Sequence, residues 1–241
     1  MTTNLEGNPK ILLEKIKEIY NEGWIKTKRK GDTGVGYTLE TKLGISANSK
    51  KTPDFRGIEI KSFRERTKGK LVTLFSQVPN WKESKTDRSE ILSNYGYEDQ
   101  NKRFNLYCSV FGNEKNSLNW KLKVDRENKK ILAINNDNKV TFWNFDKIEK
   151  RITEKHKESF FVFAQTKVEN NFEYFLYNKV IYATNASLEN FLNLIEKGKV
   201  CQDFVMHKKD NGSTRDHGFL WRIRNTSIPN LFENKNEIEL G

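Results

Sequence analysis

The sequence predicts a mixed α/β (α+β) fold in which a mixed central sheet is flanked by helices. Short apolar segments with strand-like alternation are interleaved with amphipathic segments of helical period along the chain. One continuous apolar run, residues 160–165, is typical of a buried central strand. At 241 residues the chain is long enough for one large domain or two closely packed lobes.

The first part of the chain contains two predicted helices. The first helix starts at Pro9, carries apolar residues at helical spacing and stops at Gly23. A basic segment then leads into three glycines, and a second helix is predicted over about residues 35–43. The loop of residues 46–52 connects this helix to a short apolar strand.

The rest of the chain is rich in predicted strands. They cover residues 71–75, 104–111, 120–124, 131–134, 140–143, 160–165, 200–206 and 219–223, with a turn at 135–138. Residues 145–156 predict a helix, and Ser187 caps a further helix that ends at Gly198. Residues 79–103 are polar and punctuated by Pro, Asn and Gly, so they predict a long irregular segment.

Charge and cysteine content indicate the partner and the compartment. A formal net charge of +11 and a pI near 9.4 favour a polyanionic partner, most economically nucleic acid. The alternative is a basic surface that only maintains solubility. Cys108 and Cys201 lie in apolar runs, which predicts core residues of a reduced, cytoplasmic protein. No zinc-like spacing, signal peptide or apolar span is present, so we expect no membrane partner.

The segment of residues 52–62 carries the clearest chemical signal. Ile58 and Ile60 alternate with Glu59 and Lys61, so in a strand the carboxylate and the ammonium share one face. The alternative is a solvated strand face with a simple ion pair, because acid-x-Lys triplets are common in a chain that is 31% charged.

Two more acids can join this pair. Pro53 and Gly57 permit a tight bend that places Asp54 at the end of a neighbouring strand, beside Glu59. Glu40 lies on the second predicted helix and joins the group only if that helix packs against the strand. Carboxylates and a lysine at a sheet edge can hold a hard divalent cation and position a water for attack on phosphate. The candidate catalytic residues are Glu40, Asp54, Glu59 and Lys61.

Two other segments are candidates for contact with a polyanion. Lys28, Arg29 and Lys30 precede glycines near a helix start, a pattern that suits phosphate, although it matches neither a P-loop nor a dinucleotide fingerprint. Residues 207–222 offer side chains suited to base edges, or form an ordinary charged hairpin turn. The candidates in this second segment are His207, Lys209, Arg215, Asp216, His217 and Arg222.

The order of these motifs resembles the MvaI/BcnI group of type II restriction endonucleases, in the MutH-like branch of the PD-(D/E)XK nuclease superfamily. The resemblance is carried by residues 23–24, 27–36, 53–55, 58–61, 71–75, 216–218 and 222–223. It is dense over about residues 20–75 and returns near 205–224. The stretch from Leu39 to Asp54 is also similar to the mismatch-repair nickase MutH.

This resemblance implies a PD-(D/E)XK nuclease core and a magnesium-dependent endonuclease that cuts double-stranded DNA. Asp54 and Glu59 would bind Mg²⁺, Lys61 would orient or activate the attacking water, and Glu40 would be the extra acid of MutH-like sites. The enzyme would be a monomer that cuts a short, nearly palindromic site of the CC-x-GG kind, one strand at a time. A cognate DNA methyltransferase would be its genetic partner.

The resemblance also implies a division of residues 1–241 into two lobes that form a DNA cleft. A catalytic lobe would be centred on about residues 1–95 with later core elements, and a recognition lobe would include about residues 200–230. Two alternatives stay open: a MutH-like nicking enzyme that depends on partner proteins and methylation, and a catalytically silent DNA-binding module. The intact acidic set argues against the silent module.

Overall fold

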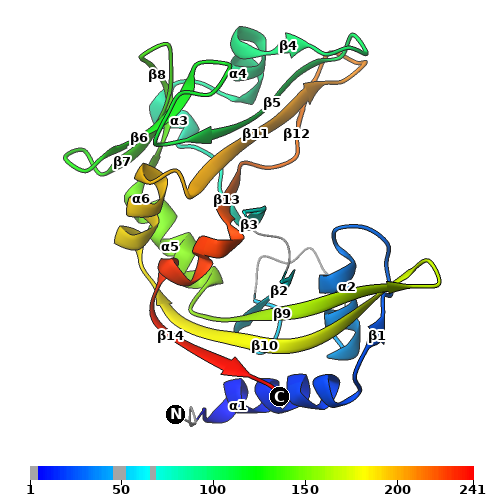
Figure 1. Cartoon of the computed structure of the whole chain (residues 1–241). Coiled ribbons are helices and arrows are strands. Elements are labelled where there is room, and N and C mark those ends of the chain that lie inside the picture. Colours follow the sequence, from blue (N-terminus) through cyan, green and yellow to red (C-terminus); the bar gives the residue numbers. More distant parts are fainter. Residues whose placement is uncertain (1–4, 46–52, 66–68) are drawn as a thin grey trace. The chain divides into compact units, whose positions relative to one another are not determined.

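The computed structural model describes residues 5–45, 53–65 and 69–241 (Figure 1). The predicted loop of residues 46–52 lies outside this described part. The chain divides into two compact units. Unit 1 contains residues 1–69, 153–186 and 232–241, and unit 2 contains residues 70–152 and 187–231. Both units combine helices with sheets, so the predicted mixed α/β class is confirmed.

Unit 1 is built around one mixed sheet. It contains α1 (Gly7–Asn21), β1 (Ile25–Lys26), α2 (Gly34–Lys42), β2 (Ile58–Arg64), β9 (Glu158–Glu169), β10 (Phe172–Ala186) and β14 (Phe232–Glu239). The strand order is β1-β10-β9-β2, and β14 also pairs with β10. β2 runs parallel to β9, whereas the other pairs are antiparallel. β9 is interior to the sheet, as its apolar run predicts.

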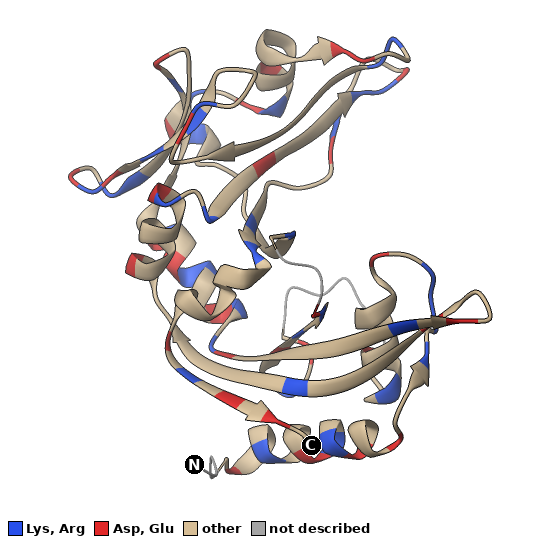
Figure 2. Cartoon of the chain, in the orientation of Figure 1, with Lys and Arg blue, Asp and Glu red and all other residues tan. Residues whose placement is uncertain are grey.

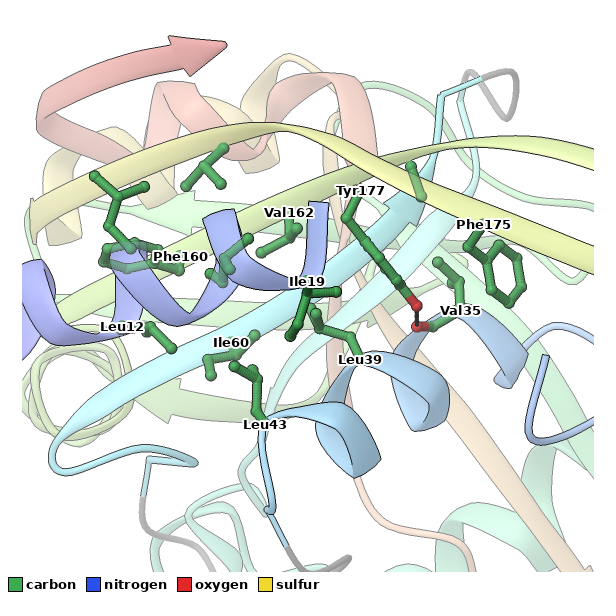
Figure 3. Packing of buried hydrophobic residues seen from close by; sticks show 14 of the residues in the cluster. Leu12, Ile19, Val35, Leu39, Leu43, Ile60, Phe160, Val162, Phe175 and Tyr177 are labelled. Carbon is green, nitrogen blue, oxygen red and sulfur yellow. Dashed lines mark hydrogen bonds between the residues drawn. The ribbon is translucent and has the colours of Figure 1, made fainter. Parts of the chain in front are cut away.

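The core of unit 1 lies between its two helices and one face of the sheet (Figure 3). The spacing of Val35, Leu39 and Leu43 predicted the buried side of α2, and all three residues belong to this core. Ile58 and Ile60 of β2 enter the same core. The apolar residues of β2 therefore fix which face of the strand carries the alternate residues, Glu59 and Lys61.

Unit 2 contains two antiparallel sheets and several short helices. Its elements are β3 (Leu71–Ser76), α3 (Trp81–Ser84), α4 (Arg88–Tyr95), β4 (Tyr97–Glu98), β5 (Phe104–Phe111), β6 (Trp120–Asp125), β7 (Lys130–Asn135), β8 (Asn138–Asn144), α6 (Leu188–Glu196), β11 (Val200–Lys208), β12 (Thr214–Asp216), β13 (Leu220–Arg224) and the 3-10 helix η1 (Asn225–Leu231). One sheet has the order β3-β13-β11-β5-β4 with β12 on β11, and the other has the order β6-β7-β8. Helix α5 (Phe145–Lys155) begins in unit 2 and ends in unit 1.

The segment of residues 79–103 differs from its prediction, because it contains α3, α4 and β4. Asp87 caps α4: its carboxylate accepts hydrogen bonds from the backbone N–H groups of Ser89 and Glu90 at 2.6 and 3.0 Å. The buried residues of α4, Ile91 and Leu92, are adjacent in sequence and give no helical period. The local spacing was therefore too weak to indicate this helix.

Unit 2 contains residues of both lobes that we expected. Residues 70–95 lie in unit 2, because β3 pairs with β13 in the larger sheet of that unit. Residues 200–230 also lie in unit 2.

Both cysteines are free thiols, and burial raises the pKa of Cys108 to about 12. None of the described helices is long and apolar enough to cross a membrane.

Candidate active site and DNA-contact residues

A tight turn places Asp54 at the outer edge of β2. Phe55 and Ile58 exchange backbone hydrogen bonds of 2.9 and 2.8 Å. The two residues between them have φ values of 45° and 92°, the left-handed backbone that a two-residue hairpin turn requires. The turn brings Asp54 Oδ2 within 3.0 Å of the backbone nitrogen of Ile60, which donates to it. Asp54 thus lies directly before this turn and not on a neighbouring strand.

Glu59 and Lys61 share one face of β2, as the alternation predicts. The Lys61 Nζ lies 2.6 Å from Glu59 Oε1. The side chain of Glu59 is only 1% exposed, whereas that of Lys61 is 28% exposed. A solvated strand face is therefore the wrong interpretation for Glu59. A carboxylate at this depth needs compensating positive charge, because burial of an unpaired charge costs several kcal/mol.

A second lysine, which we did not predict, supplies part of this charge. Lys155 is the last residue of α5, and its Nζ lies 2.6 Å from Glu59 Oε2. The chain continues from α5 into β9, where Ser159 is the pairing partner of Glu59. Each oxygen of the Glu59 carboxylate therefore faces one ammonium group. No local spacing links Lys155 to Glu59, and only the parallel pairing of β2 with β9 brings them together.

Burial and the charges of neighbouring acids raise the pKa values of Asp54 and Glu40. Burial raises the pKa of Asp54, and the nearby charge of Glu59 raises it further. Burial also raises the pKa of Glu40, and the charge of Asp54 raises it further. The charge of Lys61 lowers it. Glu40 thus lies close enough to β2 for the charges of Glu59 and Lys61 to act on it, because α2 packs beside β2. The structure brings all four predicted catalytic candidates together.

Two carboxylates of this site, those of Asp54 and Glu59, could hold a hard divalent cation. Among the described residues, no group of three or more His, Cys, Asp or Glu side chains is placed to hold a metal ion. Mg²⁺ usually keeps several waters and is held through one or two carboxylates together with substrate phosphates. Asp54 and Glu59 provide two such carboxylates, and a cation would relieve the repulsion that raises the pKa of Asp54.

A pocket of about 330 Å³ opens beside these residues. Its walls come from Arg29, Asp32 and Thr33, from the first turns of α2 and from residues 60–62 of β2. Arg29 and Lys61 contribute positive charge to the pocket, and Glu40 contributes a carboxylate. An anionic group that entered the pocket would therefore meet cations next to the acidic set.

The basic residues before α2 are exposed, and two of them, Lys28 and Arg29, contact side chains of α2. Lys28, Arg29 and Lys30 lie between β1 and α2. The backbone nitrogen of Lys28 donates to Thr38 Oγ1 at 2.9 Å, and the Arg29 guanidinium carbon lies 3.9 Å from the centre of the Tyr37 ring. Lysine and arginine residues are found on both units (Figure 2).

The second set of contact candidates gathers on one hairpin of unit 2. His207 on β11 pairs with Arg215 on β12, and Lys209 lies exposed in the turn between these strands. The rings of His207 and His217 have centroids 5.4 Å apart, and the Tyr107 hydroxyl lies 3.1 Å from His207 Nδ1. The hairpin that we considered as the alternative is thus present, and it displays these polar groups together.

Asp216 and Arg222 are engaged in contacts within unit 2. Asp216 forms an ion pair with Arg88 of α4. Arg222 donates to Asp203 Oδ2 at 2.9 Å and to the carbonyl oxygen of Leu71 at 2.7 Å. Arg222 on β13 therefore joins its neighbours β11 and β3. These contacts between strands gave no signal in the local sequence.

A family model and solved structures are similar to most of this chain. The model of the MvaI/BcnI restriction endonuclease family matches residues 13–232. The structure of the restriction endonuclease MvaI–cognate DNA substrate complex is 26% identical, with a TM-score of 0.79, and the match covers 99% of this chain and 100% of that chain. The structure of MvaI in the absence of DNA is 24% identical, with a TM-score of 0.62, and covers 98% and 100% of the two chains. No curated protein matches the chain.

Proposed function

The chain belongs to the MvaI/BcnI restriction endonuclease family and is a type II site-specific deoxyribonuclease, and from this premise we propose that Asp54 and Glu59 bind the Mg²⁺ with which it hydrolyses double-stranded DNA. The observation that carries this proposal is the buried Glu59 carboxylate, held between Lys61 and Lys155 and next to Asp54. Buried acids that lie close to one another, with raised pKa values such as those of Asp54 and Glu40, are typical of catalytic sites.

Each residue of the site has a distinct part in the proposed reaction. Bound Mg²⁺ would polarise the phosphate and favour ionisation of a water. Lys61, whose ammonium pairs with Glu59 and which lines the pocket, would orient the attacking water and stabilise the negative charge that builds up on the phosphate. Glu40 would accept a hydrogen bond from the same water from the α2 side of the pocket.

The exposed cations would bind DNA at two places. Lys28, Arg29 and Lys30 would contact backbone phosphates, which fix position but carry no sequence information. In unit 2, His207, Lys209, Arg215 and His217 are the groups of the β11–β12 hairpin that we propose for reading base edges. Asp216 and Arg222 would support this surface through Arg88 and Asp203.

We propose that the enzyme acts as a monomer on a short, nearly palindromic site of the CC-x-GG kind. One chain has one set of Asp54, Glu59 and Lys61, and one such set hydrolyses one strand per encounter. Supercoiled plasmid incubated with Mg²⁺ is therefore expected to pass through an open-circular form before it becomes linear. Gel analysis over time should show a rate that is proportional to enzyme concentration.

The same digest separates the alternatives. A restriction enzyme linearises unmethylated plasmid without partner proteins, and sequencing of the ends gives its site and cut position. A product that stays nicked until partner proteins are added would favour the MutH-like alternative. Direct conversion to linear DNA with second-order dependence on enzyme would contradict the monomer. Protection of the site by methylation would identify the chemistry of a cognate methyltransferase.

Replacement of His217 by Ala is expected to reduce discrimination between cognate and non-cognate duplexes by roughly tenfold or more, because a lost base contact is worth about 1–3 kcal/mol. His217 is exposed, so the melting temperature should stay unchanged. The measurement compares the Kd of both duplexes in the absence of divalent metal. Lys115→Ala, at an exposed ion pair with Asp137 elsewhere in unit 2, is the control. Equal loss of affinity for both duplexes would assign His217 to the backbone instead.

A further inference from the structure

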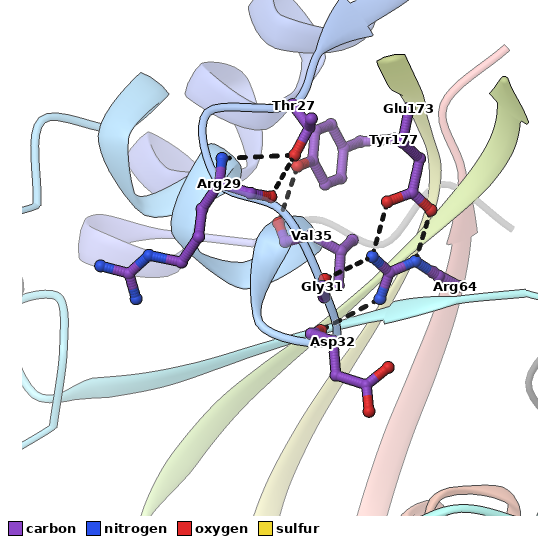
Figure 4. Close-up of polar contacts among 8 residues, drawn as sticks. All are labelled: Thr27, Arg29, Gly31, Asp32, Val35, Arg64, Glu173 and Tyr177. Carbon is purple, nitrogen blue, oxygen red and sulfur yellow. Dashed lines mark hydrogen bonds and ion pairs between the residues drawn. The ribbon is translucent and has the colours of Figure 1, made fainter. Parts of the chain in front are cut away.

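Arg64, the last residue of β2, contacts two other segments of unit 1 at once (Figure 4). Its Nε and Nη2 donate to the two oxygens of the Glu173 carboxylate, on β10, at 2.6 and 2.7 Å. Nη1 donates to the carbonyl oxygen of Asp32 at 3.0 Å, and Nη2 also donates to that of Gly31 at 2.9 Å. Arg64 thereby links β2 and β10 to the segment of residues 27–33, which we call the glycine loop.

These contacts form a strong and directional connection. A bidentate pair between guanidinium and carboxylate is about twice as strong as neutral hydrogen bonds and fixes the plane of the guanidinium. The Arg64 and Glu173 side chains are only 15% and 24% exposed, so water screens the pair less than a surface ion pair. Because Glu173 fixes its plane, the guanidinium can donate to the carbonyl oxygens of Gly31 and Asp32 at the same time. A lysine has no planar fork of donors and cannot reproduce this geometry.

The glycine loop itself is built as an ordered element. Thr27 Oγ1 donates to the carbonyl oxygen of Arg29 at 2.6 Å. Gly34, at the start of α2, approaches this carbonyl so closely that an added Cβ would lie 2.4 Å from the oxygen. The Tyr177 hydroxyl donates to the carbonyl oxygen of Val35 at 2.8 Å (Figure 4). The loop and the first turn of α2 therefore hold one shape, and Arg64 sets where that shape lies relative to β2.

The position of the loop matters because it carries Lys28, Arg29 and Lys30 and lines the 330 Å³ pocket beside Lys61. Arg64 and Lys61 are on the same strand. We propose that Arg64 is a positioning residue for the substrate: it holds the glycine loop so that its cations meet a DNA backbone phosphate in register with the active site. This inference rests on the proposed function, which supplies DNA as the ligand.

Three variants separate positioning from stability. Arg64→Gln removes the clamp but leaves Glu173 as a half-buried carboxylate without its partner. Arg64→Gln/Glu173→Gln removes that stranded charge and should regain most of the melting temperature, although the loop is still released. Arg64→Lys keeps the positive charge but not the fork. The control is Lys179→Gln, at an ion pair on β10 in which Lys179 contacts the exposed Glu237 of β14.

The measurement is the affinity for a non-cognate duplex, by fluorescence anisotropy without divalent metal at several salt concentrations. We expect the Arg64→Gln variants to bind about tenfold more weakly, with the slope of log K against log salt reduced by about one unit, as for one lost phosphate contact. Arg64→Lys should show a reduced slope even though its charge is kept. Lys179→Gln should keep the wild-type slope, and backbone amides of residues 28–36 should exchange faster only in the Arg64 variants.

Each other outcome overturns a specific claim. A folded Arg64→Gln protein with wild-type affinity and slope would overturn the positioning role. Full recovery of affinity in the double variant would also overturn it, because the loss would then come from the stranded Glu173 charge. Wild-type affinity in Arg64→Lys would assign the effect to charge alone. If the wild-type chain bound no duplex DNA, the proposed function would fail before any variant was compared.

Discussion

Replacement of Glu59 by Gln is expected to lower the rate of DNA cleavage by on the order of 10³-fold or more while leaving specific DNA binding largely intact. The amide keeps the shape of the side chain but loses the charge of a metal ligand, and it removes the partner that fixes the Lys61 ammonium 2.6 Å away. Affinity comes mainly from phosphate and base contacts, which this change does not touch. Single-turnover cleavage with Mg²⁺ and binding without divalent metal measure the two effects separately.

Two related changes and one control complete this test. Asp54→Asn and Lys61→Ala should show the same separation of cleavage from binding. Glu169→Gln, at an exposed acid that pairs with Lys167 at the end of β9, removes one negative charge outside the site and should cleave normally. Cleavage that survived the change at Glu59 or at Asp54 would contradict the site assignment.

Features of the fold that depend on neighbours in sequence could be predicted. The spacing of Val35, Leu39 and Leu43 gave the buried side of α2, and Ser187 gave the start of α6, where its side chain accepts a hydrogen bond from the backbone of Asn190. The alternation in residues 58–61 gave the shared face of Glu59 and Lys61. Helical period, strand period and capping are local properties, so one sequence is sufficient to find them.

Features that depend on strand pairing could not be predicted in this way. Alternation indicates which face of a strand a residue occupies, but not whether another element covers that face, so the burial of Glu59 was missed. β14 was missed because its residues are mostly polar and exposed, and it is a strand only through its pairing with β10. The clamp between Arg64 and Glu173 joins β2 to β10, and Arg222 joins β13 to its neighbours, through contacts between residues that are distant in sequence.

Lys155 is the most consequential of these missed residues, and Lys155→Met is expected to lower the free energy of unfolding by about 3 kcal/mol or more. The substitution leaves Oε2 of a carboxylate that is 1% exposed without the ammonium that lies 2.6 Å away. Lys61 still faces Oε1, so the loss should stay below that of a fully unpaired charge. Urea denaturation of the metal-free protein, followed by circular dichroism, measures the change.

The double variant Glu59→Gln/Lys155→Met distinguishes a charge effect from a packing effect. If Lys155 compensates the Glu59 charge, neutralising both residues should recover most of the stability that Lys155→Met loses. If the double variant were no more stable than the single one, the loss would come from packing at the end of α5. Lys179→Met, at the more exposed pair with Glu237, should change stability by less than about 1 kcal/mol.

Mg²⁺ provides an independent test of the same charge arrangement. A cation held by Glu59 and Asp54 would supply positive charge where Lys155→Met has removed it. Added Mg²⁺ should therefore raise the melting temperature of Lys155→Met more than that of the wild-type protein, because the variant has more uncompensated charge to neutralise. An equal shift in both proteins would mean that the cation binds away from Glu59. Lys155 would then stabilise the carboxylate, but Glu59 would lose its proposed role as a metal ligand.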